Sequence, residues 1–221
     1  MELPLPADVP GLSRGASHTY KELSWDEILL EGFIGEGSFG RVRRAQWRGM
    51  DVAVKTLRYE GDPEESLADL RHEARVLARV AMHSNIVPFV GVVLAPEPAV
   101  VTRYCAYGSL EDAWVRARPA HFDLPTAVDM LVDAGNGVHH LHSEKVIHRD
   151  LAARNILIDE NLRARVSDFG FSRVKESCAS KGYTASTLGP IRWTAPEAMR
   201  RKMYAEPSDV FSFGVLLYEV F

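Results

Sequence analysis

The chain is poor in cysteine, and this excludes several classes of protein. Only two cysteines, Cys105 and Cys178, occur among 221 residues, whereas a disulfide framework needs a larger set. No Cys-x-x-Cys pair is present, so the sequence indicates neither a thiolate zinc site nor a dithiol redox centre. Because few thiols and no disulfide pattern are typical of a reducing compartment, we expect a cytoplasmic location.

Long apolar segments and a charge excess are also missing. No run approaches the roughly 20 apolar residues that span a bilayer, the N-terminus lacks a signal-peptide pattern, and residue 2 is not the glycine that myristoylation requires. We therefore expect no direct membrane insertion. The formal net charge is −4, from 26 basic and 30 acidic residues. Such a balance gives no general attraction to nucleic acid, and no feature of the sequence specifies an oligomeric state.

The hydrophobic pattern changes from β-type to α-type along the chain. Residues 1–22 are rich in Pro, Gly and Ser and are predicted to be a flexible segment. Short β-branched runs then predict strands, and apolar residues after Gly108 recur at helical spacing. The result is an α+β prediction with a β-rich lobe over 23–104 and a mainly helical lobe over 105–221.

Four strands and one helix of the first lobe are clear enough to delimit. The strands are predicted at 41–47, 51–56, 88–94 and 99–104. Between them, Asp62-Pro63 has the residue types of an N-cap followed by proline in the first helical turn. A helix is therefore expected to begin there and to interrupt the strands.

The first lobe contains the glycine-rich segment Gly35-Glu36-Gly37-Ser38-Phe39-Gly40. Alone, this G-x-G-x-x-G pattern is weak, since it occurs in dinucleotide-binding folds, phosphate-binding hairpins and ordinary turns. A dinucleotide-binding fold would need a helix directly after Gly40, where the pattern predicts a strand. We favour a hairpin whose glycines let the backbone approach phosphates, and a purely structural turn stays the alternative.

Lys55 and Glu73 are expected to meet inside the first lobe. Lys55 ends the apolar strand segment Val52-Ala53-Val54-Lys55, and Glu73 falls at the edge of the apolar stripe of the predicted helix. A carboxylate that faces a core needs a partner. Paired with Glu73, Lys55 would point at the phosphates of a nucleotide as a compact positive charge.

The strongest motif is the octapeptide His148-Arg149-Asp150-Leu151-Ala152-Ala153-Arg154-Asn155, predicted as a loop before a short strand at 156–158. Asp150 could accept the proton of a substrate hydroxyl, and Asn155 could offer its amide oxygen to a hard cation. Asp168, in the tripeptide Asp168-Phe169-Gly170, follows at a spacing that suits a short hairpin. It could hold magnesium against the phosphates.

A long polar stretch separates Gly170 from the segment Thr194-Ala195-Pro196-Glu197. Loops of this length inside a domain are usually functional. The stretch contains several hydroxyl side chains that could accept phosphate: Tyr183, Thr184, Ser186 and Thr187. Because Arg149 could pair with a phosphate on this loop, we predict that Tyr183 and Arg149 form a regulatory switch.

With these motifs in this order, residues from about Trp25 to Phe221 resemble the protein kinase superfamily. The resemblance implies ATP and Mg²⁺ as cofactors and a protein as substrate. It gives catalytic roles to Asp150, Lys55, Glu73 and Arg154, and metal binding to Asn155 and Asp168. It assigns nucleotide binding to Ile34, Gly35, Gly37, Gly40, Val42, Ala53, Lys55, Thr102, Cys105, Asp112 and Leu157.

Within this resemblance, two signals disagree about the acceptor residue. The segment 45–55 resembles the tyrosine-kinase-like group, most members of which modify serine or threonine. The catalytic loop instead has Ala152 where serine/threonine kinases usually have lysine, and Arg154 supplies the cation as in tyrosine kinases. Pro190 and Trp193 also resemble the tyrosine-kinase platform for a flat phenol. Because the catalytic loop contacts the acceptor, we favour tyrosine, with serine/threonine as the alternative.

The resemblance also implies helices after the last residue of this chain. Phe221 falls inside the expected central helix of the second lobe, whose apolar face would be left exposed. The usual arginine partner of Glu197 would lie in the missing part, whereas Asp209, which matches the residue that supports the catalytic loop from below, is present. A hypothesis of another class is therefore an incomplete fragment that binds nucleotide or acts as a scaffold.

Overall fold

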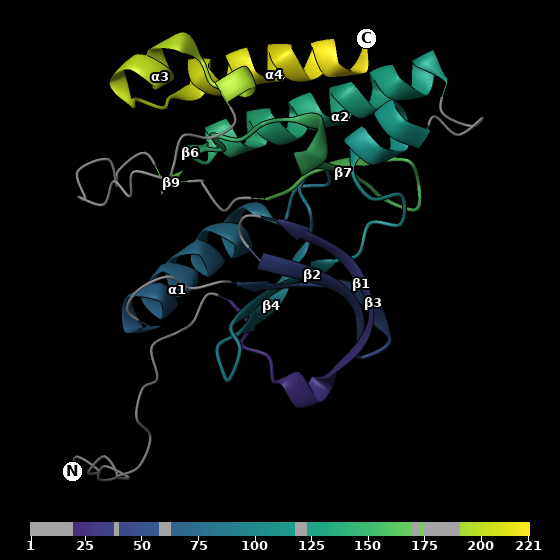
Figure 1. The fold of residues 1–221 in the computed structure, drawn as a ribbon, viewed down its shortest axis with the longest axis vertical. Helices are drawn as coiled ribbons and strands as arrows, with labels where there is room; N and C mark the ends of the chain where they lie inside the picture. The colour runs from purple at the N-terminus through teal and green to yellow at the C-terminus, as the bar shows by residue number, and fades with distance from the viewer. Residues whose placement is uncertain (1–19, 38–39, 58–62, 118–122, 169–172, 175–190) are drawn as a thin grey trace, which may run out of the picture.

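The computed structural model describes residues 20–37, 40–57, 63–117, 123–168, 173–174 and 191–221. Figure 1 shows a first lobe built on an antiparallel sheet with one helix, and a second lobe that is mainly helical. The α+β, two-lobed prediction is confirmed. No described helix is both long and apolar enough to cross a membrane.

The first lobe is a five-stranded sheet with the order β1-β2-β3-β5-β4, in which all neighbours are antiparallel. The strands are β1 (Ile28–Gly37), β2 (Gly40–Trp47), β3 (Met50–Leu57), β4 (Phe89–Val93) and β5 (Ala99–Arg103). Both ends of each of the last four strands lie within one residue of the predicted bounds. Because β2 begins at Gly40 itself, where a dinucleotide-binding fold needs a helix, that alternative is wrong.

The register of the sheet gathers the predicted nucleotide-binding residues on one face. Val52 and Val54 of β3 are fully buried against other apolar residues of the lobe. Ala53 and Lys55 alternate with them and therefore face the opposite side. Val42 pairs directly with Lys55, and Thr102 pairs with Ala53, so all four side chains share this second face.

Packing on the sheet begins before residue 23. The backbone of Lys21 accepts a hydrogen bond from the N–H of Val92 (3.0 Å), and the N–H of Leu23 donates to the carbonyl of Val92 (2.7 Å). A side chain at Gly91 would approach the Lys21 carbonyl oxygen to 2.6 Å, so only glycine fits beside this segment. Tyr20 is buried as well. Residues 20–22 are thus part of the lobe, and the rest of the predicted flexible segment lies outside the described residues.

Helix α1 (Pro63–Val80) lies beside the sheet, and its predicted cap Asp62 falls outside the described residues. The second lobe contains α2 (Leu124–Ser143), α3 (Pro196–Arg201) and α4 (Glu206–Val220), with α2 and α4 adjacent in Figure 1. Two small antiparallel sheets complete it: β6 (Val146–Ile147) pairs with β9 (Arg173–Val174), and β7 (Ile156–Ile158) forms a hairpin with β8 (Ala164–Val166). Val210 and Tyr218 of α4 are 63% and 85% exposed, which confirms the predicted exposed apolar face.

The segment between α1 and β4 binds the two lobes together. The N–H of Val87 donates to the carbonyl of Val166 (3.0 Å), and the N–H of Val166 donates to the carbonyl of Asn85 (2.8 Å). The side-chain amide of Asn85 donates to the carbonyl of Ala164 (3.2 Å). Gly137 of α2 lies so close that a Cβ there would be 2.6 Å from the Asn85 oxygen. The β8 strand is therefore fixed to the first lobe through its backbone.

Two histidine rings stack at this junction. The rings of His83 and His140 lie 4.5 Å apart at an interplanar angle of 13°. Nδ1 of His83 accepts a hydrogen bond from the N–H of Asn85 (3.2 Å), which requires an unprotonated Nδ1. Burial and the neighbouring His140 lower the pKa of His83. The junction therefore favours neutral His83.

Acidification is expected to weaken the fold through His83. Its folded-state pKa lies below the ordinary value of about 6.5, so the unfolded chain takes up the proton first as the pH falls. The free energy of unfolding should then drop from about pH 7 down through the folded pKa. Urea denaturation at pH 7.5 and 5.5 should show a smaller loss for His83→Gln than for the wild type. Equal losses would show that His83 does not contribute.

Candidate active site

The loop 148–155 lies between β6 and β7 and is fixed by one buried carboxylate. Asp209, in the first turn of α4, accepts the backbone N–H of His148 at Oδ2 (2.8 Å) and that of Arg149 at Oδ1 (2.9 Å). Nε2 of His142 also donates to Oδ2 (2.9 Å). Arg149 has a φ of 72°, an unfavourable conformation for a residue with a side chain. The bonds to Asp209 hold the loop in this conformation.

His148 connects the loop to the segment that precedes Asp168. Its Nε2 donates to the carbonyl of Ser167 (2.8 Å), while its Nδ1 accepts the N–H of Asp150 (3.3 Å). A carbonyl only accepts hydrogen bonds, so Nε2 is the donor nitrogen of the ring and Nδ1 faces the N–H of Asp150. The fully buried His148 thus acts as a structural link between Asp150 and the start of the Asp168 segment.

The carboxylate of Asp150 has a donor on each oxygen. Nη2 of Arg154 lies 2.5 Å from Oδ1, and Nδ2 of Asn155 donates to Oδ2 at 2.9 Å. Burial raises the pKa of Asp150 above its ordinary value, although Arg154 and Asn155 act in the opposite direction. A carboxylate that is buried, oriented and more basic than usual has the properties of a general base.

Lys55 reaches from the sheet to the second lobe. Its Nζ lies 2.7 Å from Oδ1 of Asp168, and both side chains are half-buried. From the sequence we predict Glu73 as the partner of Lys55, whereas the contact described here is to Asp168. Glu73 is half-buried on α1, and its pairing with Lys55 stays a prediction. The Lys55–Asp168 contact joins two residues that the sequence predicts to bind phosphate and metal.

Asn155 and Asp168 have the chemistry that a magnesium site requires. The side-chain NH₂ of Asn155 donates to both the backbone oxygen (2.6 Å) and Oδ2 (2.9 Å) of Asp150. This orientation makes Oδ1 of Asn155 the atom that can act as a ligand. Asp168 adds a carboxylate, and Mg²⁺ prefers such oxygen donors. The residues therefore fit the cation that the resemblance implies.

The predicted nucleotide-binding residues lie around the connection between the lobes. Leu157 of β7 is bridged to Ser109, whose hydroxyl donates to Oδ2 of the exposed Asp112 (2.7 Å). Cys105 is buried just after β5, and burial raises the pKa of its thiol to about 12, so it is an unreactive thiol. Five further members of the predicted set lie on the β1–β2 hairpin: Ile34, Gly35, Gly37, Gly40 and Val42.

The described residues include only one member of the predicted pair Tyr183 and Arg149. Tyr183, the predicted regulatory acceptor, falls in the segment 175–190, which the structure does not describe. Its partner Arg149 is half-buried, with its guanidinium carbon 5.2 Å from the centroid of the Tyr204 ring. The switch between Tyr183 and Arg149 stays a prediction.

Residues on α4 that support the loop are not evident from the motifs. Oε2 of Glu219 accepts the N–H of Ala153 (2.9 Å), and Oγ of Ser212 donates to the carbonyl of Trp193 (2.6 Å). Ser212 and Glu219 are 3 and 10 positions after Asp209, which places them on the same face of α4. Polar residues in the buried stripe of an apolar helix are the signal that could have found them.

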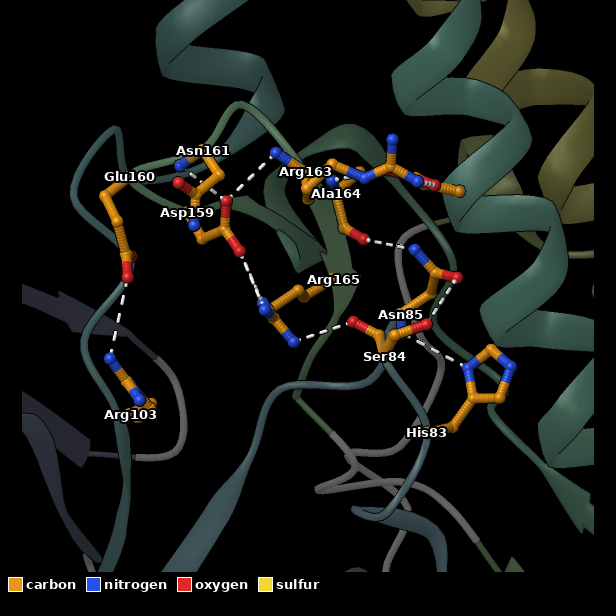
Figure 2. Close-up of polar contacts among 11 residues, drawn as sticks. His83, Ser84, Asn85, Arg103, Asp159, Glu160, Asn161, Arg163, Ala164 and Arg165 are labelled. Atoms are coloured by element: carbon orange, nitrogen blue, oxygen red, sulfur yellow. Dashed lines mark hydrogen bonds and ion pairs between the residues drawn. The ribbon is translucent and has the colours of Figure 1, made fainter.

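A cluster of polar side chains connects β8 and the β7–β8 turn to the segment after α1 (Figure 2). Arg165 of β8 donates through Nε (2.9 Å) and Nη2 (2.7 Å) to Oδ2 of Asp159, and through Nη1 to the carbonyl of Ser84 (2.7 Å). Oδ1 of Asp159 accepts the N–H groups of Asn161 (2.9 Å) and Arg163 (3.0 Å). Asp159 therefore fixes the β7–β8 turn and, through Arg165, the segment after α1.

Asp159→Asn is expected to lower the free energy of unfolding at pH 7 by about 2–3 kcal/mol, because Arg165 would lose a buried carboxylate. Although burial raises the pKa of Asp159, its bonds to Arg163, Arg165 and Asn161 leave it below the ordinary value. The wild-type advantage should be complete above about pH 3.9 and disappear as the pH falls through the folded pKa.

Urea denaturation of both proteins at pH 7 checks this. The control is Glu160→Gln, because Glu160 is exposed and makes only a 3.5 Å pair with Arg103 (Figure 2). We expect less than about 0.5 kcal/mol for it. Equal effects of the two substitutions would contradict the assigned role of Asp159.

Comparison with known proteins identifies relatives over most of the chain. Residues 28–221 match the model of the family described as protein tyrosine and serine/threonine kinase. Ephrin type-A receptor 8 of Homo sapiens is 41% identical over 214 residues, which are 93% of this chain and 21% of the receptor. Ephrin type-B receptor 5 of Gallus gallus is 38% identical over 199 residues, or 88% of this chain and 20% of the receptor.

A relative of another kind matches equally well. The "Probable serine/threonine-protein kinase SIS8" of Arabidopsis thaliana is 38% identical over 203 residues, which are 90% of this chain and 19% of that protein. The chain spans 12% to 21% of the length of the curated relatives that it matches. Relatives named as receptors and relatives named as serine/threonine kinases thus share this stretch.

Proposed function

Since the chain belongs to the protein tyrosine and serine/threonine kinase family, we propose that it transfers the γ-phosphoryl group of ATP to a side-chain hydroxyl of a protein, with tyrosine as the acceptor. The observation that carries this proposal is the buried, hydrogen-bonded environment of the Asp150 carboxylate. The carboxylate is buried, oriented by Arg154 and Asn155, and linked through His148 to the segment of Asp168. This arrangement supports a general base beside a phosphate- and metal-binding centre.

In the proposed mechanism, ATP supplies the phosphoryl group and Mg²⁺ neutralises the charge of its phosphates. Lys55 binds the phosphates from the sheet, and its contact with Asp168 joins the phosphate-binding cation to the magnesium-binding carboxylate. Asn155 and Asp168 hold the metal through their oxygens. The glycine-rich hairpin covers the phosphates, and positioning with charge neutralisation provides most of the catalysis.

Asp150 acts on the acceptor in this mechanism. It orients the acceptor hydroxyl and accepts its proton as the oxygen attacks the γ-phosphorus, and the bond from this phosphorus to the β–γ bridging oxygen breaks. Arg154, 2.5 Å from Asp150, supplies positive charge beside the transferring group. The raised pKa of Asp150 makes the carboxylate a stronger base than an exposed aspartate.

Tyrosine is proposed as the acceptor because the cation that contacts the carboxylate of Asp150 is Arg154. Ala152, at the position of the usual serine/threonine-kinase lysine, is fully buried and carries no charge. The cation beside Asp150 thus comes from position 154, which is the arrangement that the resemblance to tyrosine kinases implies, and not from position 152.

Phosphoamino-acid analysis tests this proposal. The chain is incubated with γ-labelled ATP, Mg²⁺ and a peptide library that contains all three hydroxyl residues. We expect label on phosphotyrosine. Label on phosphoserine and phosphothreonine alone would overturn the tyrosine proposal and leave the kinase proposal in place. If label is absent while Mg²⁺-ATP raises the melting temperature, the chain binds nucleotide without transferring phosphate.

A further inference from the structure

The Arg154 side chain lies between two partners of different kinds. Its Nη2 contacts Oδ1 of Asp150 at 2.5 Å, and its guanidinium carbon lies 4.6 Å from the centroid of the Trp193 ring. Guanidinium groups bind the faces of indole rings through both electrostatic attraction and flat stacking. Arg154 thus contacts the carboxylate through Nη2, and its guanidinium carbon lies over the indole ring.

Trp193 is itself fixed, although it lies 39 positions along the chain from Arg154. It ends the short 3₁₀ turn Ile191–Trp193, and its carbonyl accepts the hydroxyl of Ser212 from α4 (2.6 Å). The next residue, Thr194, is buried. The indole Nε1 is buried and has no hydrogen-bond partner among the described residues. Arg154 lies over the face of this ring.

Asp150 alone is a weak means of holding Arg154. The arginine side chain remains 30% exposed, so solvent screens its ion pair. Arginine also has many rotamers, and the entropy lost when one rotamer is fixed offsets part of the free energy gained from a single contact. A rigid aromatic surface on the other side of the guanidinium removes many of these alternatives and strengthens the pair at the same time.

We propose that Trp193 is a positioning residue of the phosphotransfer site, which holds the Arg154 guanidinium against the carboxylate of Asp150. The proposal rests on the proposed role of Asp150 as the base. The support runs from the buried Ser212 of α4 through the backbone of Trp193 to its ring, and from there to Arg154 and Asp150. The segment that contains Trp193 thereby controls the charge next to the base.

A rival explanation is that Trp193 only fills space between the turn and α4. The two explanations differ in whether the effect of Trp193 depends on Arg154. If the ring acts by holding the guanidinium, its removal should lower kcat for phosphoryl transfer only while Arg154 is present. A space-filling role would lower the activity and the melting temperature equally with and without Arg154.

The experiment compares Trp193→Leu, which removes the aromatic face, with Trp193→Phe, which keeps one. We expect kcat of Trp193→Leu to fall about 5- to 10-fold with little change in KM for ATP, and kcat of Trp193→Phe to stay near the wild type. In an Arg154→Met background, Trp193→Leu should cause no further loss of kcat, because the ring has no cation to hold. An unchanged kcat in Trp193→Leu, or an equal further loss in the Arg154→Met background, would overturn the proposal.

A spectroscopic measurement tests the contact without turnover. The indole ring current shifts the NMR resonances of the Arg154 guanidinium, so these resonances test Trp193 even if the wild type transfers no phosphate and the proposed function fails. The shift should be present in the wild type and in Trp193→Phe and absent in Trp193→Leu, and its absence from the wild type would contradict the proposal. If Trp193→Leu does not fold, Arg154→Lys tests the contact from the other side, because an ammonium keeps the charge but loses flat stacking. Its kcat should fall as well, and an unchanged kcat would contradict the proposal.

Discussion

Asp150→Asn is expected to lower kcat for phosphoryl transfer at least about 100-fold, since general-base catalysis typically contributes 10²–10⁴-fold. The amide keeps the shape of the side chain but cannot accept the proton of the acceptor hydroxyl. Single-turnover transfer from γ-labelled ATP measures the chemical step directly. The increase in melting temperature that Mg²⁺-ATP causes should stay close to that of the wild type, because Asp150 is not proposed to bind nucleotide.

Asp129→Asn is the matched control for this prediction. Asp129 is an exposed aspartate on α2 with no place in the proposed site, so its neutralisation should leave the rate unchanged. A transfer rate in Asp150→Asn within a few-fold of the control would mean that Asp150 is not the base. A large loss in both variants would point to an effect of overall charge instead.

Asp209→Asn is expected to cost about 3–5 kcal/mol of folding stability, which is a large part of the 5–15 kcal/mol typical of a domain. Asp209 is completely buried and accepts hydrogen bonds from His148, Arg149 and His142. An asparagine would turn an NH₂ group toward one of these donors and leave polar groups unsatisfied. The loop with its positive-φ Arg149 would lose the bonds that hold it.

Urea denaturation at pH 7 measures this loss, again with Asp129→Asn as the reference variant. Transfer activity should fall in the same variant even at temperatures where it is folded, because the His148-Asp150 segment is no longer fixed. A loss below about 1 kcal/mol with normal activity would show that other contacts support the loop and that Asp209 is dispensable.

Much of the first lobe follows from local pattern. Alternating β-branched residues predicted β2, β3 and β5, because one face of this sheet is buried in an apolar cluster and the other is not. The same alternation put Val42, Ala53, Lys55 and Thr102 on one face, as the register confirms. The octapeptide with Asp150 was recognisable because its residue types and spacing depend on chemistry rather than on packing.

The contacts of the site across long sequence separations were not predictable in the same way. Lys55 has an equally plausible acidic partner in Glu73, and its contact with Asp168 depends on how the lobes meet. The positive φ of Arg149 accompanies the tertiary hydrogen bond of its N–H to Asp209 and does not follow from local preference. The contact of Trp193 with Arg154 joins residues 39 positions apart and depends on the 3₁₀ turn at Trp193, which has no local pattern.

The central claim is that Asp150, supported by Arg154, Asn155 and Asp209, is the base of a phosphotransfer site that modifies tyrosine. Phosphoamino-acid analysis of labelled peptide, from parallel reactions of the wild type and Asp150→Asn with Mg²⁺ and γ-labelled ATP, tests it most directly. We predict labelled phosphotyrosine from the wild type and at least about 100-fold less from the variant. Equal labelling by the two proteins, or no labelling by a folded wild type that binds Mg²⁺-ATP, would contradict it.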